Sequence, residues 1–132
     1  MSLRDDLIRD EGVKLKPYQC TAGRTTIGVG RNLDDVGITE AEAYALLDND
    51  IIRVTHQLEK ELPWIKGRSG SIRRALGNMA FQLGINGLLK FKRMLACLEA
   101  SDYAGAQIEA LDSAWAKQTP ERAKRVISLF TT

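Results

Sequence analysis

The sequence has no long apolar run and few of the residues that build disulfide or metal sites. No stretch approaches the roughly 18 to 20 apolar residues that a membrane-spanning helix needs. Residues 1–6 carry acids and no apolar core of a secretory signal, so we expect the chain to accumulate in the cytoplasm without a signal peptide. The two cysteines, Cys20 and Cys97, lack metal-type spacing. We therefore expect reduced thiols, with no disulfide framework and no zinc site.

Aromatic residues and histidine are also scarce. Aromatics make up 6% of the chain, and His56 is the single histidine. Proteins that bind single-stranded nucleic acid interleave aromatic and basic side chains, and no such interleaving occurs here. We therefore expect no nucleic-acid partner. His56 lies in a stretch with helical spacing, and we expect it to face solvent.

The formal net charge of +2 is unevenly distributed. Residues 1–65 hold 8 Lys and Arg against 12 Asp and Glu, a balance of −4, whereas residues 66–132 hold 11 against 5, a balance of +6. A basic half suits a polyanionic partner such as a phosphate-bearing cell wall. The alternative is an ordinary solvated surface.

With 44% hydrophobic and 27% charged residues, the 132-residue chain is typical of one globular domain, residues 1–132. Ser2 and Asp5 indicate a helix start, and Gly12 its end. Residues 15–33 are rich in Thr, Ile, Val, Tyr and Gly, which predicts a small β-hairpin or meander. A capping-box pattern at Thr39 and Glu42 opens a long helix that ends at Pro63.

Further helices are expected over residues 72–83, 88–98, 102–111 and from Pro120 onward, with a break at Asn86-Gly87 and an α+β class overall. Ser101 or Asp102 can cap the third of these helices, and Thr119 can cap the last. The last helix should turn four residues inward: Ala123, Val126, Ile127 and Phe130.

Glu11 is the first candidate for chemistry. On a helix it shares the apolar face with Leu7 and Ile8, so we expect its carboxyl to be partly desolvated. Desolvation raises the pKa of a carboxyl group, as a general acid requires. The alternative, which is the commoner fate of an acid at a helix end, is that Glu11 is merely solvated or paired.

The expected strand over residues 25–30 offers two faces. Alternation places Thr25, Ile27 and Val29 toward the core, and it places Thr26 on the other face beside two glycines, where a ligand could approach the backbone. Alternatively, the glycines simply permit a bend. Cys20 precedes the turn and could face Thr26 as a base, a nucleophile or a small buried apolar side chain.

These segments resemble the T-even phage lysozyme family, glycoside hydrolase family 24. The N-terminal resemblance rests on Asp10-Glu11-Gly12, Leu15-Lys16, Tyr18, Thr21, Gly23 and Thr26-Ile27-Gly28-Val29-Gly30. The C-terminal resemblance rests on Asn78-Met79-Ala80-Phe81-Gln82-Leu83-Gly84, Gly87, Phe91, Trp115 and the run from Gln118 to Ile127. The spacing of a Glu, eight residues, a Cys or Asp, five residues and a Thr is specific to that family.

The resemblance implies a lysozyme-like α+β fold, mostly helical, with a small β-containing lobe (about 13–62) and a helical lobe (about 1–12 plus 63–132) joined by a long helix. It implies a muramidase that cleaves the β-1,4 bond between N-acetylmuramic acid and N-acetylglucosamine in peptidoglycan with inversion, and without metal or cofactor. Glu11 would be the general acid, and Cys20 and Thr26 would position or activate water. The implied sugar contacts are Asn32, Phe81, Gln82 and Glu109, although Phe81 could equally be a core residue.

The family resemblance also carries expectations about the biological setting. We expect a bacteriolytic monomer that serves host lysis by a phage or prophage and has no stable membrane association. A holin-type pore made by a partner would release it from the host cytoplasm to the cell wall.

The sequence departs from the best-known members of that family at three places. Cys20 stands where they carry Asp, and a free thiol with a pKa of about 8.5 is a weaker base at neutral pH than a carboxylate. Either a cation such as Arg24 or Arg31 ionises Cys20, or the thiol merely orients water together with Thr26. Arg31 replaces a histidine, so any stabilising pair built on that histidine is absent. About twenty residues are missing between Leu33 and Gly37, which trims the small lobe.

Two other functions are compatible with parts of the sequence. A cysteine hydrolase would use Cys20 and His56, but nothing orients His56 and Glu11 would have no role. A non-catalytic, lysozyme-like module that binds the cell wall would use the basic half and would not depend on Glu11.

Overall fold

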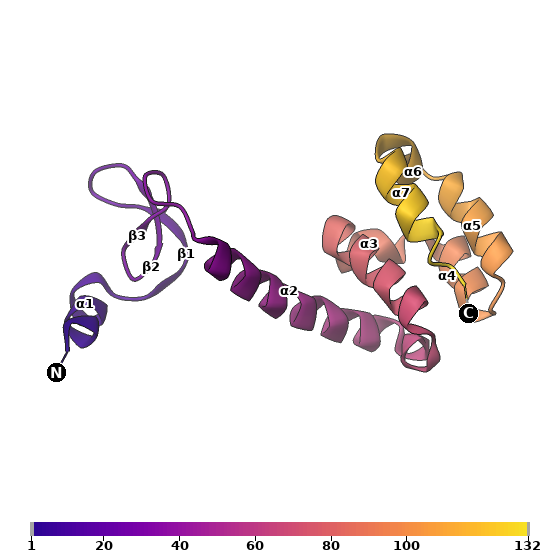
Figure 1. Ribbon diagram of the computed structural model, residues 1–132, viewed down its shortest axis with the longest axis horizontal. Helices are drawn as coiled ribbons and strands as arrows, with labels where there is room; N and C mark the ends of the chain where they lie inside the picture. The colour runs from indigo at the N-terminus through magenta and orange to yellow at the C-terminus, as the bar shows by residue number, and fades with distance from the viewer. Residues whose placement is uncertain (1, 132) are drawn as a thin grey trace. The chain divides into compact units, whose positions relative to one another are not determined.

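The computed structural model describes residues 2–131 and contains two compact units, Met1–Leu46 and Leu47–Thr132 (Figure 1). The N-terminal unit contains α1 (Leu3–Glu11), β1 (Lys14–Gln19), β2 (Thr25–Gly28), β3 (Arg31–Asn32) and the start of α2 (Glu40–Glu61). The C-terminal unit contains the rest of α2, η1 (Pro63–Gly67), α3 (Gly70–Leu89), α4 (Lys92–Glu99), α5 (Tyr103–Leu111), α6 (Ala114–Gln118) and α7 (Pro120–Ile127). This composition confirms the predicted α+β class, whereas the expected assignment of residues 1–12 to the helical lobe stays a prediction.

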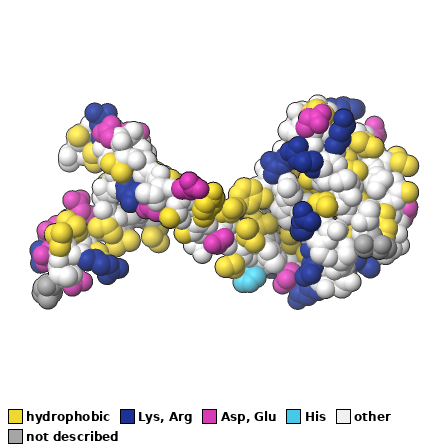
Figure 2. All heavy atoms as spheres, viewed as in Figure 1, with side chains coloured by type: hydrophobic (Ala, Val, Ile, Leu, Met, Phe, Trp, Pro, Cys, Tyr) yellow, Lys and Arg dark blue, Asp and Glu magenta, His cyan; other side chains and the backbone are white. Residues whose placement is uncertain are grey.

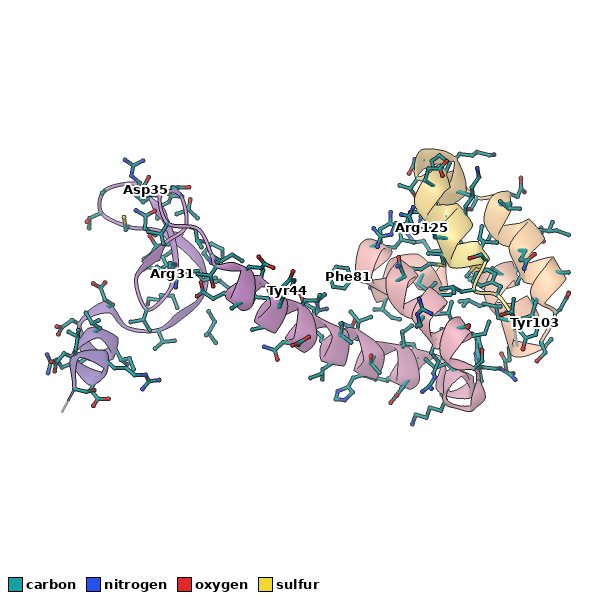
Figure 3. The ribbon with its side chains drawn as sticks, viewed as in Figure 1. Arg31, Asp35, Tyr44, Phe81, Tyr103 and Arg125 are labelled. Atoms are coloured by element: carbon teal, nitrogen blue, oxygen red, sulfur yellow. The ribbon has the colours of Figure 1, made fainter. Side chains whose placement is uncertain are left out.

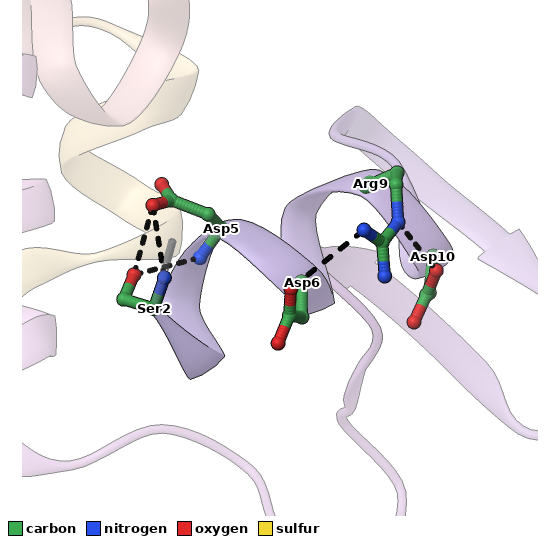
Figure 4. A network of polar contacts seen from close by, with 5 residues as sticks. All are labelled: Ser2, Asp5, Asp6, Arg9 and Asp10. Carbon is green, nitrogen blue, oxygen red and sulfur yellow. Dashed lines mark hydrogen bonds and ion pairs between the residues drawn. The ribbon is translucent and has the colours of Figure 1, made fainter.

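Helix α1 begins where the capping pattern predicted. The Ser2 hydroxyl accepts the Asp5 backbone N–H at 3.2 Å, and the Asp5 carboxylate accepts the Ser2 backbone N–H at 3.3 Å (Figure 4). Farther along, Arg9 pairs with Asp6 and Asp10. None of the described residues of α1 is buried, so local polar contacts define this helix.

The three strands form an antiparallel meander in the order β1-β2-β3. Tyr18 lies opposite Thr26 in the first pair, and Thr26 lies opposite Asn32 in the second. The predicted assignment of the β2 faces is wrong: Thr26 is only 3% exposed, whereas Val29, expected in the core, is 39% exposed. Thr26 lies on the central strand and has a paired strand on each side, whereas Val29 lies in the turn that follows β2, beyond its last residue Gly28.

Helix α2 opens with the predicted capping box and gains a contact that the sequence did not reveal. The Thr39 hydroxyl accepts the Glu42 N–H at 3.1 Å, and the Glu42 carboxylate accepts the Thr39 N–H at 2.8 Å. The same carboxylate receives two hydrogen bonds from the Arg31 guanidinium, at 2.9 and 2.8 Å. Arg31 also donates to the Gly37 carbonyl. Arg31, which replaces the histidine of the best-known family members, thus connects β3 with the start of α2 through its own hydrogen bonds.

The hydrophobic core lies in the C-terminal unit. Helix α3 alone contributes six buried residues, Ile72, Ala75, Leu76, Met79, Ala80 and Leu88. The four residues predicted to face inward around the last helix, Ala123, Val126, Ile127 and Phe130, are all buried. Trp115 is also buried, and its ring meets the Phe91 ring edge-on.

Three local predictions in this unit need correction. The break in α3 lies at Gly84, which adopts φ +75°, and not at Asn86-Gly87. The following helix begins at Lys92, because residues 88–89 still belong to α3. Thr119 precedes Pro120 as expected, but its hydroxyl donates to the Trp115 carbonyl at 3.0 Å and does not cap α7.

The remaining features of this unit are simpler. Of the two capping residues considered for α5, Asp102 is the one that accepts the Gly105 N–H. The short helix α6 was not predicted. His56 is exposed, as predicted. Among residues 2–131, no helix is both long and apolar enough to cross a membrane.

Candidate active site

The predicted site residues are divided between the two units. Glu11, Cys20, Thr26 and Asn32 belong to the N-terminal unit, and the other three, Phe81, Gln82 and Glu109, belong to the C-terminal unit. The three residues with predicted catalytic roles therefore lie together in one unit of 46 residues.

Glu11 is the last residue of α1, and its carboxyl group lies against the turn between β2 and β3. A Cβ added at Gly30 would lie 3.0 Å from both Cδ and Oε2 of Glu11. Gly30 also has φ +70°, a conformation that side-chain-bearing residues rarely adopt. The glycine thus leaves room for the carboxyl group beside the backbone. Glu11 is exposed, in contrast to the partial burial predicted from its helical phase.

Cys20 and Thr26 are joined through one carbonyl group. The Arg24 carbonyl accepts the Cys20 backbone N–H at 2.9 Å and the Thr26 hydroxyl at 2.9 Å. A further hydrogen bond from the Gly23 N–H to the Cys20 carbonyl, at 2.8 Å, closes the turn. Cys20 does not lie directly opposite Thr26, because Tyr18 occupies that position, but it lies two residues closer to the turn and therefore on the same face as Tyr18. The half-buried thiol and the buried hydroxyl are therefore diagonal neighbours.

The pKa of the Cys20 thiol is lowered, chiefly by the backbone N–H of Arg24 and next by that of Ala22. Burial opposes this effect, and the Thr26 hydroxyl adds to it. The cations considered from the sequence are occupied elsewhere, since Arg24 faces Asp35 at 3.5 Å and Arg31 binds Glu42. The thiolate is thus favoured by turn amides, as hydrogen bonds to a charged group favour its ionised form.

Asn32 begins a polar network that the sequence did not predict. Its side-chain amide donates to Asp35 at 2.9 Å, and its carbonyl oxygen accepts the Asp35 backbone N–H at 3.0 Å. The neighbouring Asp34 carboxylate accepts the backbone N–H of Thr25 at 2.8 Å. Figure 3 labels Asp35 and Arg31 in this unit. The available signal was an Asn-Leu-Asp-Asp run at the end of a strand, since Asn and Asp side chains often bind nearby backbone groups.

Phe81 and Gln82 follow each other on α3 and have different surroundings. Phe81 is 48% exposed, so it is not a core aromatic (Figure 3). Gln82 is half-buried, and its side-chain oxygen accepts the Trp115 indole N–H at 2.9 Å. That contact fixes the orientation of the Gln82 amide and leaves its NH₂ group as the available donor.

Phe81 lines two cavities of the C-terminal unit. One, of about 640 Å³, has a mainly apolar lining between α2 and α3, which also includes Arg73, Arg74 and Arg122. A second, of about 420 Å³, lies beside the Gly84 kink. Glu109 lines a different hollow, of about 400 Å³, next to Lys92. Figure 2 shows Lys and Arg side chains gathered on the visible face of this unit, as the basic C-terminal half predicted.

The arrangement of the N-terminal unit suits acid–base chemistry. It holds an exposed carboxyl group at the end of a helix and a thiol of lowered pKa beside a hydroxyl. In the described part of the chain, no three His, Cys, Asp or Glu side chains are grouped closely enough to hold a metal ion. Both cysteines are free.

Comparison with known proteins gives one consistent result. The sequence profile of the phage lysozyme family matches residues 9–129. Probable T4-type lysozyme 2 of Dictyostelium discoideum is 35% identical over 160 aligned positions, which cover 99% of this chain and 94% of the relative. An endolysin of Acyrthosiphon pisum secondary endosymbiont phage 1 is 34% identical over 120 aligned positions, which cover 86% of this chain and 78% of the endolysin.

A third relative is much longer than this chain. The pre-baseplate central spike protein Gp5 of Enterobacteria phage T4 is 32% identical over all of this chain but only 28% of its own length. The residues with predicted roles all lie within the matched range 9–129. The profile and the coverage of the relatives together show that the chain belongs to the phage lysozyme family and is a lysozyme, an enzyme that hydrolyses peptidoglycan.

Proposed function

We propose that the chain is an inverting muramidase that cleaves the β-1,4 bond between N-acetylmuramic acid and N-acetylglucosamine. Glu11 is the general acid in this proposal, and Cys20 and Thr26 prepare the attacking water. The observation that carries the proposal is the shared Arg24 carbonyl, which places a thiol of lowered pKa beside a hydroxyl at the family's second and third site positions.

The proposed reaction follows the scheme of inverting glycosidases. Glu11 gives its proton to the glycosidic oxygen as the bond from the anomeric carbon to that oxygen breaks. A water molecule attacks the same carbon from the opposite face, and its proton passes to the Cys20 thiolate. Acid and base stand about 6.5 to 9.5 Å apart in such enzymes, which leaves room for the water. Exchange with solvent then restores both groups for the next cycle.

The remaining roles are proposed from family membership. Asn32, Phe81, Gln82 and Glu109 contact the glycan, with the exposed Phe81 ring and the free Gln82 NH₂ group as supporting observations. The protein acts as a monomer in host lysis by a phage or prophage. A holin-type pore made by a partner gives it access to the cell wall.

The decisive experiment compares Glu11→Gln with wild type in clearing chloroform-permeabilised Gram-negative cells. Removing a general acid costs about 10² to 10⁴ in rate, so Glu11→Gln should leave little clearing. Asp10→Asn is the matched control, because it neutralises the adjacent acid, which pairs with Arg9 at the surface. Equal clearing by wild type and Glu11→Gln, or none by either, would support a non-catalytic wall-binding module and overturn the proposal.

The same assay with two Cys20 variants tests the base. Cys20→Asp should retain or improve activity because a carboxylate is ionised at neutral pH, whereas Cys20→Ala should lose most of it. The activity of the wild type should rise with pH as the thiol ionises. In Cys20→Asp the same rise in activity should occur at lower pH. Full activity in Cys20→Ala would reduce Cys20 to a packing residue.

A further inference from the structure

The backbone segment 24–26 connects Cys20 with Thr26. Its first residue, Arg24, accepts hydrogen bonds at its carbonyl from both Cys20 and Thr26, and its third residue is Thr26 itself. The Arg24 N–H is also the main group that lowers the pKa of the Cys20 thiol. The position of thiol and hydroxyl relative to each other therefore depends on the backbone of residues 24–26.

The turn that follows β3 holds this backbone from its other side. The Asp34 carboxylate accepts the Thr25 N–H at 2.8 Å, and the Leu33 N–H donates to the Thr25 carbonyl at 2.8 Å. Asp35 reaches the Arg24 guanidinium at 3.5 Å and is oriented by Asn32. Both polar groups of the Thr25 backbone are thus bound by residues 33 and 34.

We propose that Asp34 is a positioning residue for the Cys20–Thr26 pair, because its carboxylate fixes the backbone segment that carries both partners. The inference rests on the proposed function, since it assigns Asp34 to the same site. Asp34 touches neither partner's reacting atoms in this role. It acts by holding the Thr25 N–H, which keeps the Arg24 carbonyl aimed at Cys20 and Thr26.

Asp34 is a better candidate for this role than Asp35. Its contact is a short, charge-assisted hydrogen bond to the backbone, which constrains the main chain directly. Asp35 contacts a long Arg24 side chain in an ion pair whose two members are both more than half exposed, and such pairs contribute little. Asp35→Ala should therefore have a smaller effect than Asp34→Ala.

The test measures alkylation of the Cys20 thiol by iodoacetamide as a function of pH, followed by peptide mapping of the full-length protein. Asp34→Ala and Asp34→Asn both remove the negative charge, but only Asn keeps an oxygen that accepts the Thr25 N–H. Their difference therefore isolates the hydrogen bond. Cys97 is an internal reference in the C-terminal unit, where burial, Asp102 and Glu109 raise the pKa of its thiol.

We expect the midpoint pH for Cys20 alkylation to be about 0.5 units higher in Asp34→Ala than in Asp34→Asn, with the Cys97 profile unchanged. Cell-wall clearing should be roughly three- to tenfold slower in Asp34→Ala than in Asp34→Asn. Identical Cys20 midpoints in the two variants would overturn the positioning role, even if both melt at lower temperature. If Asp34→Ala does not fold, Asp34→Leu takes its place, because leucine is close to asparagine in shape and has no oxygen to accept the Thr25 N–H. A Cys20 midpoint in Asp34→Leu equal to that in Asp34→Asn would overturn the proposal.

The thiol measurement also separates this inference from the proposed function. If the wild type clears no cells but the two Asp34 variants differ in Cys20 midpoint, the muramidase proposal is refuted and the positioning role of Asp34 stands. If the wild type is active but the two Asp34 variants have the same Cys20 midpoint, the positioning role is refuted and the muramidase proposal stands.

Discussion

The two units differ in what holds them together. The C-terminal unit buries 21 hydrophobic residues in one cluster, whereas Thr26 is the one buried residue among the described positions up to residue 46. The N-terminal unit relies on polar contacts: two capping boxes, the Arg31–Glu42 pair and the Asp34 bond to Thr25. It nevertheless carries all three residues with proposed catalytic roles.

This difference predicts unequal stability within one chain. Apolar burial contributes roughly 25 cal/mol per Å², while a typical hydrogen bond contributes a net 0.5 to 1.5 kcal/mol or so. A unit held mainly by hydrogen bonds should therefore open locally more often than one with a packed core. The tryptophans, Trp64 and Trp115, both lie in the C-terminal unit, so their fluorescence reports on that unit alone.

The largest expected effect is loss of stability in the C-terminal unit. Leu76 on α3 is fully buried, and Leu76→Ala should lower the free energy of unfolding by about 3 kcal/mol, within the usual range for a buried leucine. The matched variant is Leu15→Ala on β1, where the side chain is 86% exposed and the change should stay within about 0.5 kcal/mol. Chemical denaturation followed by tryptophan fluorescence measures the first, and circular dichroism measures both. If Leu76→Ala and Leu15→Ala lowered the free energy of unfolding equally, the conclusion that the hydrophobic core lies in the C-terminal unit and not around β1 would be wrong.

A smaller effect, on activity rather than on the core, is expected for Gly30→Ala. The new methyl group would meet the Glu11 carboxyl group at 3.0 Å, and φ +70° disfavours alanine there. Clearing of permeabilised cells should fall by about tenfold or more, because small displacements of a catalytic group are costly. Gly67→Ala is the control, since a Cβ at Gly67 meets nothing within 4 Å and needs no unusual φ. Wild-type clearing by Gly30→Ala would show that the Glu11 position is not constrained by this turn.

The sequence predicted the elements better than it predicted their faces. Capping residues such as Ser2 and Thr39 bind backbone groups within three positions, so their effect can be read locally. The helical period likewise located the buried side of α7. The β2 faces were misassigned because alternation does not say which side of a strand is covered, and it is Thr26, not Val29, that is buried. The α3 break was misplaced because two glycines, Gly84 and Gly87, compete for it.

The candidate site was predictable as a set of residues but not as an environment. Local motif spacing selected Glu11, Cys20 and Thr26. It could not show that turn amides, not Arg24 or Arg31, lower the thiol pKa, because the partners of those arginines lie 11 residues farther along the chain. The Asp34 bond to Thr25 was missed for the same reason, since it joins residues nine positions apart.

The smallest expected effect is a pH dependence confined to the N-terminal unit. Hydrogen bonds from Arg31, followed by the Thr39 backbone N–H, lower the pKa of Glu42 from 4.5 to about 2. Because the folded-state pKa lies below the unfolded one, the stabilisation is complete above about pH 4.5 and is lost as the pH falls through about 2. Protection of the Thr39 amide from hydrogen exchange, corrected for its intrinsic rate, should therefore decrease across this window.

Glu42→Gln removes the titrating group, so its Thr39 amide should be less protected at pH 5 and nearly independent of pH down to 2. Glu40→Gln is the control, because Glu40 accepts a hydrogen bond from Tyr44 and does not bind Arg31. Tryptophan fluorescence should stay constant over the same window if the acid-sensitive contacts belong to the N-terminal unit. A loss of tryptophan signal that parallels the Thr39 exchange would instead mean that the two units unfold together, and the contrast between them would then concern composition and not stability.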